Sequence, residues 1–435
     1  MFRNNSDIGD GNDAYAALRF RDFRLLVAAS FLVSFAQAVL SVIVGWEIYE
    51  RTDSALALGL VGLVQIVPNV ALAIPAGQYV DRHDRKRIAV AATGLVALSA
   101  VALAILTAVE GPLVLTYLAL FIIGIGRVFK SPTMGALLAG TVPDHGYTNA
   151  SAWSGSASQT ASIVGPAVGG LGVAVLSDAA WVFAIAAAML VAAAMLYGRM
   201  NPRKIEFTEE KVTRDSLLAG VRFIRSTKVI FAAITLDMVA VMLGGATALL
   251  PIFAEDVLHV GATGLGLMRA APALGAVLMS LAIAHKGPFR NAGPTLLATV
   301  ACFGLATVLF GISRSLTLSL FALFLVGAFD AISMVIRDAM ELTYTPDHMR
   351  GRVSSIHFIF IGMSNEFGEF ESGVAAAIFG ATSAVVIGGV GTLLVVPAIA
   401  LIWPEMRRLR QIVKPESFET TPAELEPVGI GTRAE

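Results

Sequence analysis

Charged side chains inside apolar stretches of this 435-residue chain include Arg127, Lys130, Arg269, Asp237, Asp330, Glu366 and Glu369. On membrane-insertion scales each would cost about 2.5 to 3.5 kcal/mol near the centre of a lipid bilayer. We therefore expect them to face a water-filled cavity or one another. A cavity lined by charges of both signs is suited to binding a polar solute and to moving protons.

Three carboxylates, Asp330, Asp237 and Glu366, are candidates for carrying a proton. Partial desolvation favours the neutral acid, whereas a nearby cation or charged solute favours the ionised form. A proton and a solute can then compete for one site, which is the simplest coupling of opposite fluxes. The alternative is that these groups only form structural ion pairs.

We predict that a second set of residues contacts the solute in the same cavity. Its members are Arg127, Lys130, Arg269, Ser34, Gln37, Gln65, Gln159, Asn365 and Glu369. We expect His357 to be a packing residue rather than a proton relay.

The sequence carries no signature of catalysis. Its single cysteine, Cys302, excludes an intrachain disulfide and a cysteine metal cluster. It has no phosphate-binding loop and no nucleotide-hydrolysis motif. We therefore predict no catalytic residue, no metal site and no cofactor, and we expect the protein not to be an enzyme.

The composition requires elements that can hold these residues in a bilayer. The chain is 56% hydrophobic and only 14% charged, with a mean hydropathy of +0.75, which indicates a polytopic membrane protein. Its net charge of −1 gives no reason to expect nucleic-acid binding. Twelve stretches are long enough to cross as helices: 25–48, 56–79, 88–109, 113–140, 148–176, 179–198, 229–252, 263–285, 294–313, 316–343, 353–380 and 383–403.

The distribution of cations predicts the orientation. Most of the 31 Lys and Arg residues fall on the side of the hairpin between the second and third stretches, whereas Arg51 and Arg314 fall on the opposite side. Because cytoplasmic loops are rich in Lys and Arg, we expect the hairpin and both termini to be cytoplasmic.

The two halves of the chain repeat. Gly124 and Gly327 each precede a Pro-Asp-His sequence by 19 residues, at an offset of 203. A parallel repeat predicts two six-helix bundles related by a pseudo-two-fold axis along the membrane normal, with a cavity near the midplane. Under this offset Arg127 corresponds to Asp330, near enough in principle to pair or to share a solute.

The second and eighth stretches match at an offset of 204, which places Gln65 at the position of Arg269. We predict four parts: an N-terminal bundle at 1–198, a cytoplasmic linker at 199–228, a C-terminal bundle at 229–405 and a disordered tail at 406–435. Apolar residues at helical spacing in the linker favour an amphipathic surface helix, and a solvated connector is the equal alternative.

With the hairpin, the twelve helices and the repeat, the sequence resembles the major facilitator superfamily over nearly its whole length. The stretch from Gly77 to Lys86 is similar to its signature loop, with Asp84 where many members carry glycine. Gly165, Pro166, Gly169 and Gly170 are similar to the fifth-helix motif of the antiporter branches. Leu249-Leu-Pro-Ile-Phe, Arg350-Gly-Arg-Val and Asn365-Glu-Phe-Gly-Glu are similar to the branch containing macrolide-efflux and enterobactin-export proteins.

The resemblance implies a conformational switch, in which Asp81 joins the ends of helices 2 and 11 when the transporter faces outward. The implied switch residues are Gly77, Asp81, Arg82, Arg85, Lys86 and Arg352. Arg337 and Glu341, one turn apart, are predicted to form a latch near the cytoplasmic end. The alternative for the hairpin is a basic loop that only sets topology.

We therefore expect a monomeric, twelve-helix, proton-coupled transporter in a bacterial inner membrane, which exports a small amphipathic molecule of the drug or siderophore type. The alternatives are a lipid or lysolipid translocator, an importer, and a membrane sensor with a transporter-like body.

Overall fold

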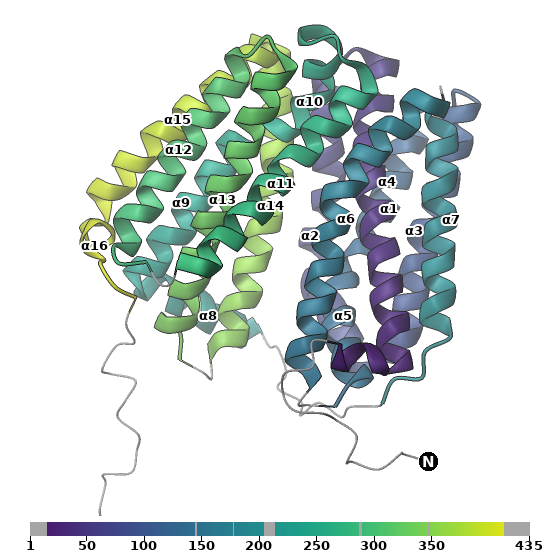
Figure 1. The fold of residues 1–435 in the computed structure, drawn as a ribbon, viewed down its shortest axis with the longest axis horizontal. Helices are drawn as coiled ribbons and strands as arrows, with labels where there is room; N and C mark the ends of the chain where they lie inside the picture. The colour runs from purple at the N-terminus through teal and green to yellow at the C-terminus, as the bar shows by residue number, and fades with distance from the viewer. Residues whose placement is uncertain are drawn as a thin grey trace, which may run out of the picture.

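The computed structural model describes residues 15–143, 146–176, 178–203, 214–286, 289–346 and 349–412, and within them every regular element is a helix. Figure 1 shows two helical bundles standing side by side. The N-terminal bundle contains α1 (Arg21–Thr52), α2 (Ala55–Arg82), α3 (Arg85–Ala108), α4 (Leu113–Val128), α5 (Lys130–Thr141), α6 (Tyr147–Leu176) and α7 (Ala179–Gly198).

The C-terminal bundle begins with α9 (Lys228–Gly244), which continues through three short elements, η3 (Ala246–Leu249), α10 (Leu250–Ile252) and η4 (Phe253–Val257). The bundle's longer helices are α11 (Gly261–Lys286), α12 (Ala292–Ile312), α13 (Leu316–Tyr344), α14 (Arg350–Phe379) and α15 (Ala381–Ile402). Helix α8 (Arg214–Ser226) precedes this bundle, and α16 (Pro404–Arg408) follows it.

The described residues contain ten helices that are long and apolar enough to cross a membrane, or eleven if the bent pair α4 and α5 is counted as one span. Helix α14, with 30 residues, is more polar because it carries Glu366, Glu369 and Glu371, and it is the remaining element of the twelve that the sequence predicts. The prediction of an all-α membrane protein with two bundles is confirmed.

The predicted fourth helix, 113–140, is broken in the structure. Helices α4 and α5 meet at Phe129 with a bend of 42°. Pro132 explains the break, because its nitrogen has no hydrogen to donate to the carbonyl of Val128 and its ring crowds that carbonyl. The bend positions Arg127 and Lys130 on separate helical segments.

The packing of the bundles follows the sequence repeat. Across the interface α2 packs against α14, and α6 packs against α11. At the offset of about 203 residues α2 corresponds to α11, and α6 corresponds to α14. Replacing each helix by its counterpart therefore turns the α2–α14 contact into the α6–α11 contact, and the reverse. This exchange is the behaviour that a two-fold relation between the bundles requires.

Glycines bring the bundles together at the end of the molecule that carries Arg51. A Cβ atom added to Gly266 on α11 would lie 2.7 Å from the carbonyl oxygen of Pro166, and one added to Gly59 would lie 3.0 Å from the Cα atom of Gly373. Without side chains at these positions, the helix backbones can touch. The inter-bundle contacts are therefore concentrated at the Arg51 end, where the bundles converge in the upper part of Figure 1.

Residues near the predicted boundaries pack on the C-terminal bundle. Ile224 of α8 is buried with Val353 and Ile356 of α14. Met406, beyond the predicted end of the bundle at 405, is fully buried, and the amide of Gly293 donates to the carbonyl of Leu409 at 3.0 Å. Residues 204–213 of the predicted linker and 413–435 of the predicted tail lie outside the described residues.

We predict that Gly170→Leu prevents the bundles from closing at the Arg51 end. A Cβ atom at position 170 would lie 2.8 Å from the Cα atom of Gly266, whereas a Cβ atom at Gly155 of the same helix would meet nothing within 4 Å. The measurement uses a Cys302→Ala background with a cysteine in place of Ser41, between the bundles. With Gly170→Leu this cysteine should react several-fold faster with an impermeant maleimide added on the Arg51 side than it does with Gly170 intact.

Gly155→Leu is the matched control and should leave the labelling rate unchanged. Equal labelling of the two variants would contradict the role of the Gly170 contact.

Candidate functional site

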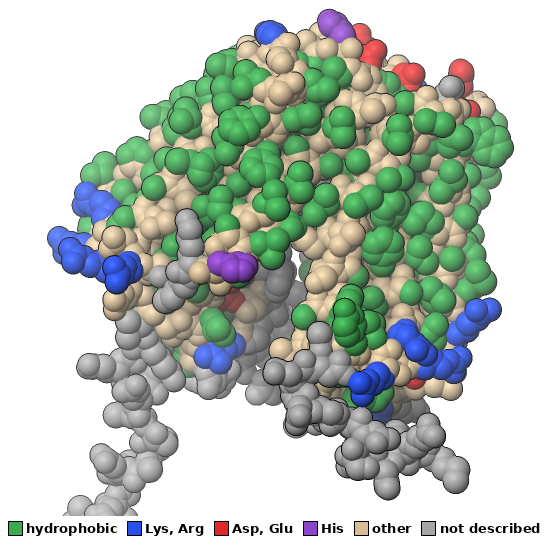
Figure 2. All heavy atoms as spheres, viewed as in Figure 1, with side chains coloured by type: hydrophobic (Ala, Val, Ile, Leu, Met, Phe, Trp, Pro, Cys, Tyr) green, Lys and Arg blue, Asp and Glu red, His purple; other side chains and the backbone are tan. Residues whose placement is uncertain are grey.

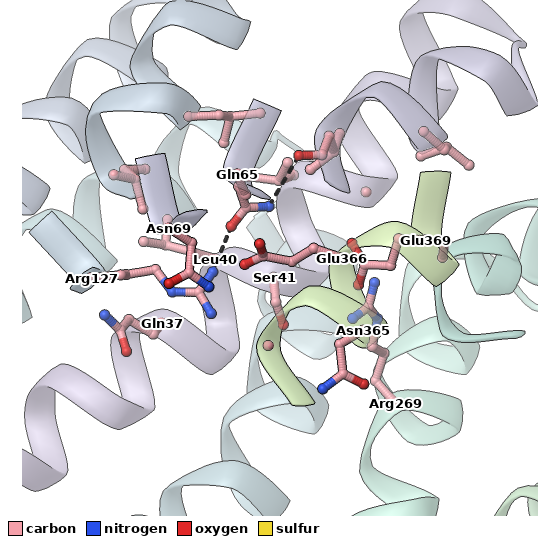
Figure 3. A pocket seen from close by; sticks show the side chains of 18 residues that line it. Gln37, Leu40, Ser41, Gln65, Asn69, Arg127, Arg269, Asn365, Glu366 and Glu369 are labelled. Atoms are coloured by element: carbon pink, nitrogen blue, oxygen red, sulfur yellow. Dashed lines mark hydrogen bonds between the residues drawn. The ribbon is translucent and has the colours of Figure 1, made fainter. Parts of the chain in front are cut away.

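A cavity of about 390 Å³ lies between the two bundles (Figure 3). Helices α1, α2 and α4 supply its wall from the N-terminal bundle, and η3, α11 and α14 supply the other wall. Its volume is within the range of about 300 to 1,000 Å³ that small-molecule sites occupy.

Two cations and two carboxylates face this cavity: Arg127, Arg269, Glu366 and Glu369. Figure 3 shows the carboxylate of Glu366 extending from α14 toward Asn69 and Arg127 of the other bundle, and the guanidinium of Arg269 pointing toward Glu369. The cavity therefore joins charged groups from both halves of the chain.

Hydrogen bonds position part of this set. Arg127 Nη1 donates to Gln65 Oε1 at 2.5 Å, which fixes the arginine against α2. Gln65 and Arg269, which the repeat places at equivalent positions, both line the cavity. The repeat counterpart of Arg127, Asp330, is not among the residues that line the cavity. Arg127 faces Glu366 instead.

Two buried polar atoms of the cavity residues have no hydrogen-bond partner within the described part of the chain, namely Arg269 Nε and Glu366 Oε2. An unpaired buried donor or acceptor is costly, so each favours a ligand that supplies its partner. Arg269 Nε is a hydrogen-bond donor, and the carboxylate oxygen Glu366 Oε2 is an acceptor.

Uncharged polar groups complete the wall. Gln37, Ser41, Gln65, Asn69 and Asn365 line the cavity beside apolar residues of α1, α2 and α4. Asn69 is absent from the predicted set, although it lies one helical turn after Gln65 and therefore on the same face of α2.

Lys130 and Ser34 lie behind this wall, inside the N-terminal bundle. Lys130 Nζ donates to Gln37 Oε1 at 2.9 Å and to Ser34 Oγ at 3.2 Å. Gln37 thus connects the lysine to the cavity. Gln159 is exposed on α6 and does not line the cavity.

Asp237 and Asp330 meet Arg337 in the C-terminal bundle, away from the cavity. The carboxylate of Asp237 forms an ion pair with Arg337 Nη1, and both residues are more than 90% buried. Asp330 Oδ1 lies 3.7 Å from Arg337 Nη2, and its side chain is 41% exposed. The structure therefore separates two of the three predicted proton carriers from Glu366.

The predicted latch between Arg337 and Glu341 is not formed. Glu341 Oε2 instead lies 2.5 Å from His357 Nδ1, and Ser354 Oγ donates to Glu341 Oε1. His357 is 8% exposed and is a hydrogen-bonding partner, not only a packing residue. Arg337 and Glu341 do not pair because each has a partner on another helix. Arg337 binds Asp237 of α9, and Glu341 binds His357 of α14.

The signature-loop residues lie at the end of the molecule opposite Arg51. Asp81, Arg82 and Asp84 are exposed, Arg85 and Lys86 are partly exposed, and Gly77 has no atom within 4 Å of an added Cβ position. Asp84 begins α3 by accepting from the amides of Lys86 and Arg87 at 2.9 and 3.2 Å, which explains an aspartate there. The backbone of Arg352 lies in α14, and its side chain is outside the described set.

The fifth-helix motif divides between two neighbours. Added Cβ atoms at Gly165 and Gly169 would meet Ala38 and Val39 of α1, whereas Gly170 faces α11. Pro166 contributes the carbonyl that approaches Gly266. The motif therefore joins helices within one bundle and across the interface.

One contact that sequence reasoning missed joins the bundles near Arg51. The hydroxyl of Tyr49 at the end of α1 donates to Asp256 of η4, a π-helical turn. The two residues are 207 positions apart, and no periodic pattern in the sequence relates them.

Comparisons with known proteins agree with this architecture. The family model described as Major Facilitator Superfamily matches residues 26–368. The enterobactin exporter EntS of Escherichia coli O1:K1 is 28% identical over 399 residues, covering 89% of this chain and 93% of that protein, and EntS of Shigella boydii serotype 18 has the same values.

Solved structures share the fold at low identity. An inward-facing, occupied bacterial homologue of the human lysosomal transporter Spinster has a TM-score of 0.73 at 13% identity, covering 93% of this chain and 99% of that one. A mutant of the nucleoside transporter NupG has a TM-score of 0.70 at 12% identity, covering 88% of this chain and 99% of that one.

We predict that Asp237→Asn destabilises the protein by about 3 kcal/mol, because it removes the closer and more deeply buried of the two carboxylates that pair with Arg337. Thermal unfolding of the detergent-solubilised protein measures this loss. Asp330→Asn is the control and should cost less, because its side chain is 41% exposed and lies farther from Arg337. Equal losses for the two variants would contradict the assignment of Asp237 as the main partner.

Proposed function

Because the chain belongs to the major facilitator superfamily, we propose that it is a proton-coupled transporter that exports a small amphipathic organic molecule by alternating access. The chain is a multi-pass membrane transporter and not an enzyme, as its family and its EntS relatives indicate. Proton coupling, the substrate and the direction of transport are the proposed parts.

The observation that carries this proposal is the position of the charged cavity. Arg127 comes from one bundle, and Arg269, Glu366 and Glu369 come from the other. A solute bound among them contacts both bundles at once. Relative rotation of the bundles would therefore change its access without moving the site through the bilayer.

Glu366 is the group that we assign to proton coupling in the cavity. Its Oε2 atom is buried and has no hydrogen-bond partner among the residues that the structure describes, and its carboxylate extends toward Arg127. Ionised Glu366 pairs favourably with a cation, whereas protonated Glu366 removes a buried charge. A solute that donates hydrogen bonds or presents a cation to ionised Glu366 would displace its proton, and departure of the solute would favour protonation again, so that proton and solute compete for this carboxylate. Asp330 and Asp237 remain alternative carriers linked through Arg337.

The charge distribution supports a defined orientation. Figure 2 shows Lys and Arg side chains gathered at the lower end of the molecule, the end of the signature loop. By the positive-inside rule this end faces the cytoplasm, with both termini. Since the bundles converge at the Arg51 end, the described conformation is inward-facing. We assign the protein to a bacterial inner membrane, as a functional monomer that binds no nucleic acid.

We propose a siderophore or a drug-like molecule as the substrate. Support comes from the EntS relatives, which are named as enterobactin exporters. The mixed lining supports it as well, since the cavity offers amides and charged groups beside apolar residues such as Leu40, Val44 and Ile123.

We predict that the native protein in proteoliposomes moves protons against added enterobactin, and that Glu366→Gln lowers this exchange at least tenfold. The amide mimics the protonated side chain and cannot release a proton. Internal pH, followed with an entrapped dye, and uptake of the siderophore are measured together, with the lumen acidic.

Glu371→Gln on the same helix is the matched control, because Glu371 does not line the cavity and should keep full exchange. Siderophore movement that is equally fast in Glu366→Gln and equally dependent on the proton gradient would refute the role of Glu366. Movement of a lysolipid in place of enterobactin would favour the translocator alternative.

A further inference from the structure

An apolar groove of about 660 Å³ runs along the outer face of the N-terminal bundle, between α3 and α7. It is separate from the cavity between the bundles, and both of its walls come from these two helices. The small residues of its floor are Ala91, Gly94, Ala194 and Gly198. The larger residues of its rim include Leu98 and Met195.

No part of the described chain occupies the floor of this groove. A Cβ atom added to Gly94 or to Gly198 would meet nothing within 4 Å. Leu98 and Met195 stand beside the floor with 70% and 54% of their surface exposed. Because these larger side chains stand above the small residues, the α3–α7 groove is a trough rather than a flat helical surface.

The trough continues along α3. A second groove of about 440 Å³ between α3 and α4 shares Leu95 and Leu98 with the first. Both α3 and α7 span the membrane, so the occupant of the trough must be compatible with hydrocarbon. An acyl chain has the required length and polarity.

Cations stand at one end of the trough. Arg87 precedes the lining residue Val90 by one turn of α3, and its side chain is 88% exposed, with its Nε atom 3.8 Å from Asp84 Oδ2. Arg199 directly follows the lining residue Gly198 and is also exposed. Because α3 starts and α7 ends at the signature-loop side, both arginines lie where lipid headgroups lie.

The opposite end of the trough has different charges. The loop after α3 carries Glu110, and Arg51 Nη2 donates to the carbonyl of Gly111 in the same loop. With one acidic and one basic residue that end has no excess of cations, so an anionic headgroup would be attracted mainly at the end of Arg87 and Arg199. The charge asymmetry selects both the class of lipid and the leaflet.

We infer that the α3–α7 groove binds a phospholipid with an anionic headgroup, whose acyl chain lies over Gly94 and Gly198 and whose phosphate lies beside Arg87 and Arg199. A second copy of the chain fits less well. A two-fold contact through this face would bring the same arginines of two copies toward one another.

The test is native mass spectrometry of the purified full chain, titrated with phosphatidylglycerol and separately with phosphatidylcholine. We expect the native protein to retain phosphatidylglycerol preferentially, and the double variant Arg87→Gln/Arg199→Gln to lose this preference at least fivefold. Arg314→Gln, at the opposite end of the molecule, is the matched control and should behave as the native protein. Equal retention of the two lipids by the native protein would overturn the proposal.

A second variant tests the groove itself. Gly94→Leu/Gly198→Leu fills the floor from positions where an added Cβ atom meets nothing within 4 Å, so it should fold normally and reduce retention of both lipids several-fold. Gly155→Leu is the control for adding a leucine at an unhindered glycine. Unchanged lipid retention in the filled variant, or a dimer that this variant alone abolishes, would contradict lipid occupancy.

Discussion

The high cost of a charge in hydrocarbon is the constraint on which this structure depends. Four charged residues lie on helices of the two bundles, and none can face lipid without a penalty of several kcal/mol: Arg127, Arg269, Glu366 and Glu369. The two bundles solve this problem by enclosing the four groups between them. The same enclosure creates a polar site at the interface, so the solution to a stability problem is also the site of transport that we propose.

Enclosure requires that the bundles meet closely at one end of the cavity. Glycines at positions 59, 170, 266 and 373 allow helix backbones from opposite bundles to touch there. The hydrogen bond from Tyr49 to Asp256 adds one directional contact to this seam. Small residues bring little side-chain burial to a contact, so such a seam can form and separate with little repacking of either bundle. Buried ion pairs such as Asp237 with Arg337 lie inside one bundle instead, where they hold it together as a unit.

The sequence predicted the elements well because apolar length and repeat spacing are local or periodic signals. The twelve stretches, the two halves and the equivalence of Gln65 with Arg269 all follow from counting along the chain. Partner choice could not be predicted in the same way. Arg337 binds Asp237 rather than Glu341, and Glu341 binds His357, because each contact depends on how neighbouring helices rotate.

The same reason explains why Arg127 faces Glu366 and not Asp330. Repeat equivalence gives two residues the same depth in the membrane but does not fix the direction in which each side chain points. The bend between α4 and α5 turns Lys130 into the N-terminal bundle, toward Ser34 and Gln37, and leaves Arg127 in the cavity. Two of the missed polar cavity residues had a signal, because Asn69 lies one turn after Gln65 and Ser41 lies one turn after Gln37.

The central claim is that the cavity opens alternately to the two sides as the bundles rotate. The most direct measurement is of spin-label distances at both ends of the molecule, in the absence and presence of enterobactin and at acidic and neutral pH. One pair of labels replaces Tyr79 on α2 and Leu342 on α13 at the signature-loop end, and the other replaces Leu56 on α2 and Ile378 on α14 at the Arg51 end. We expect the first distance to shorten when the second lengthens. Distances that stay constant under all conditions, or that change in the same direction at both ends, would contradict the account.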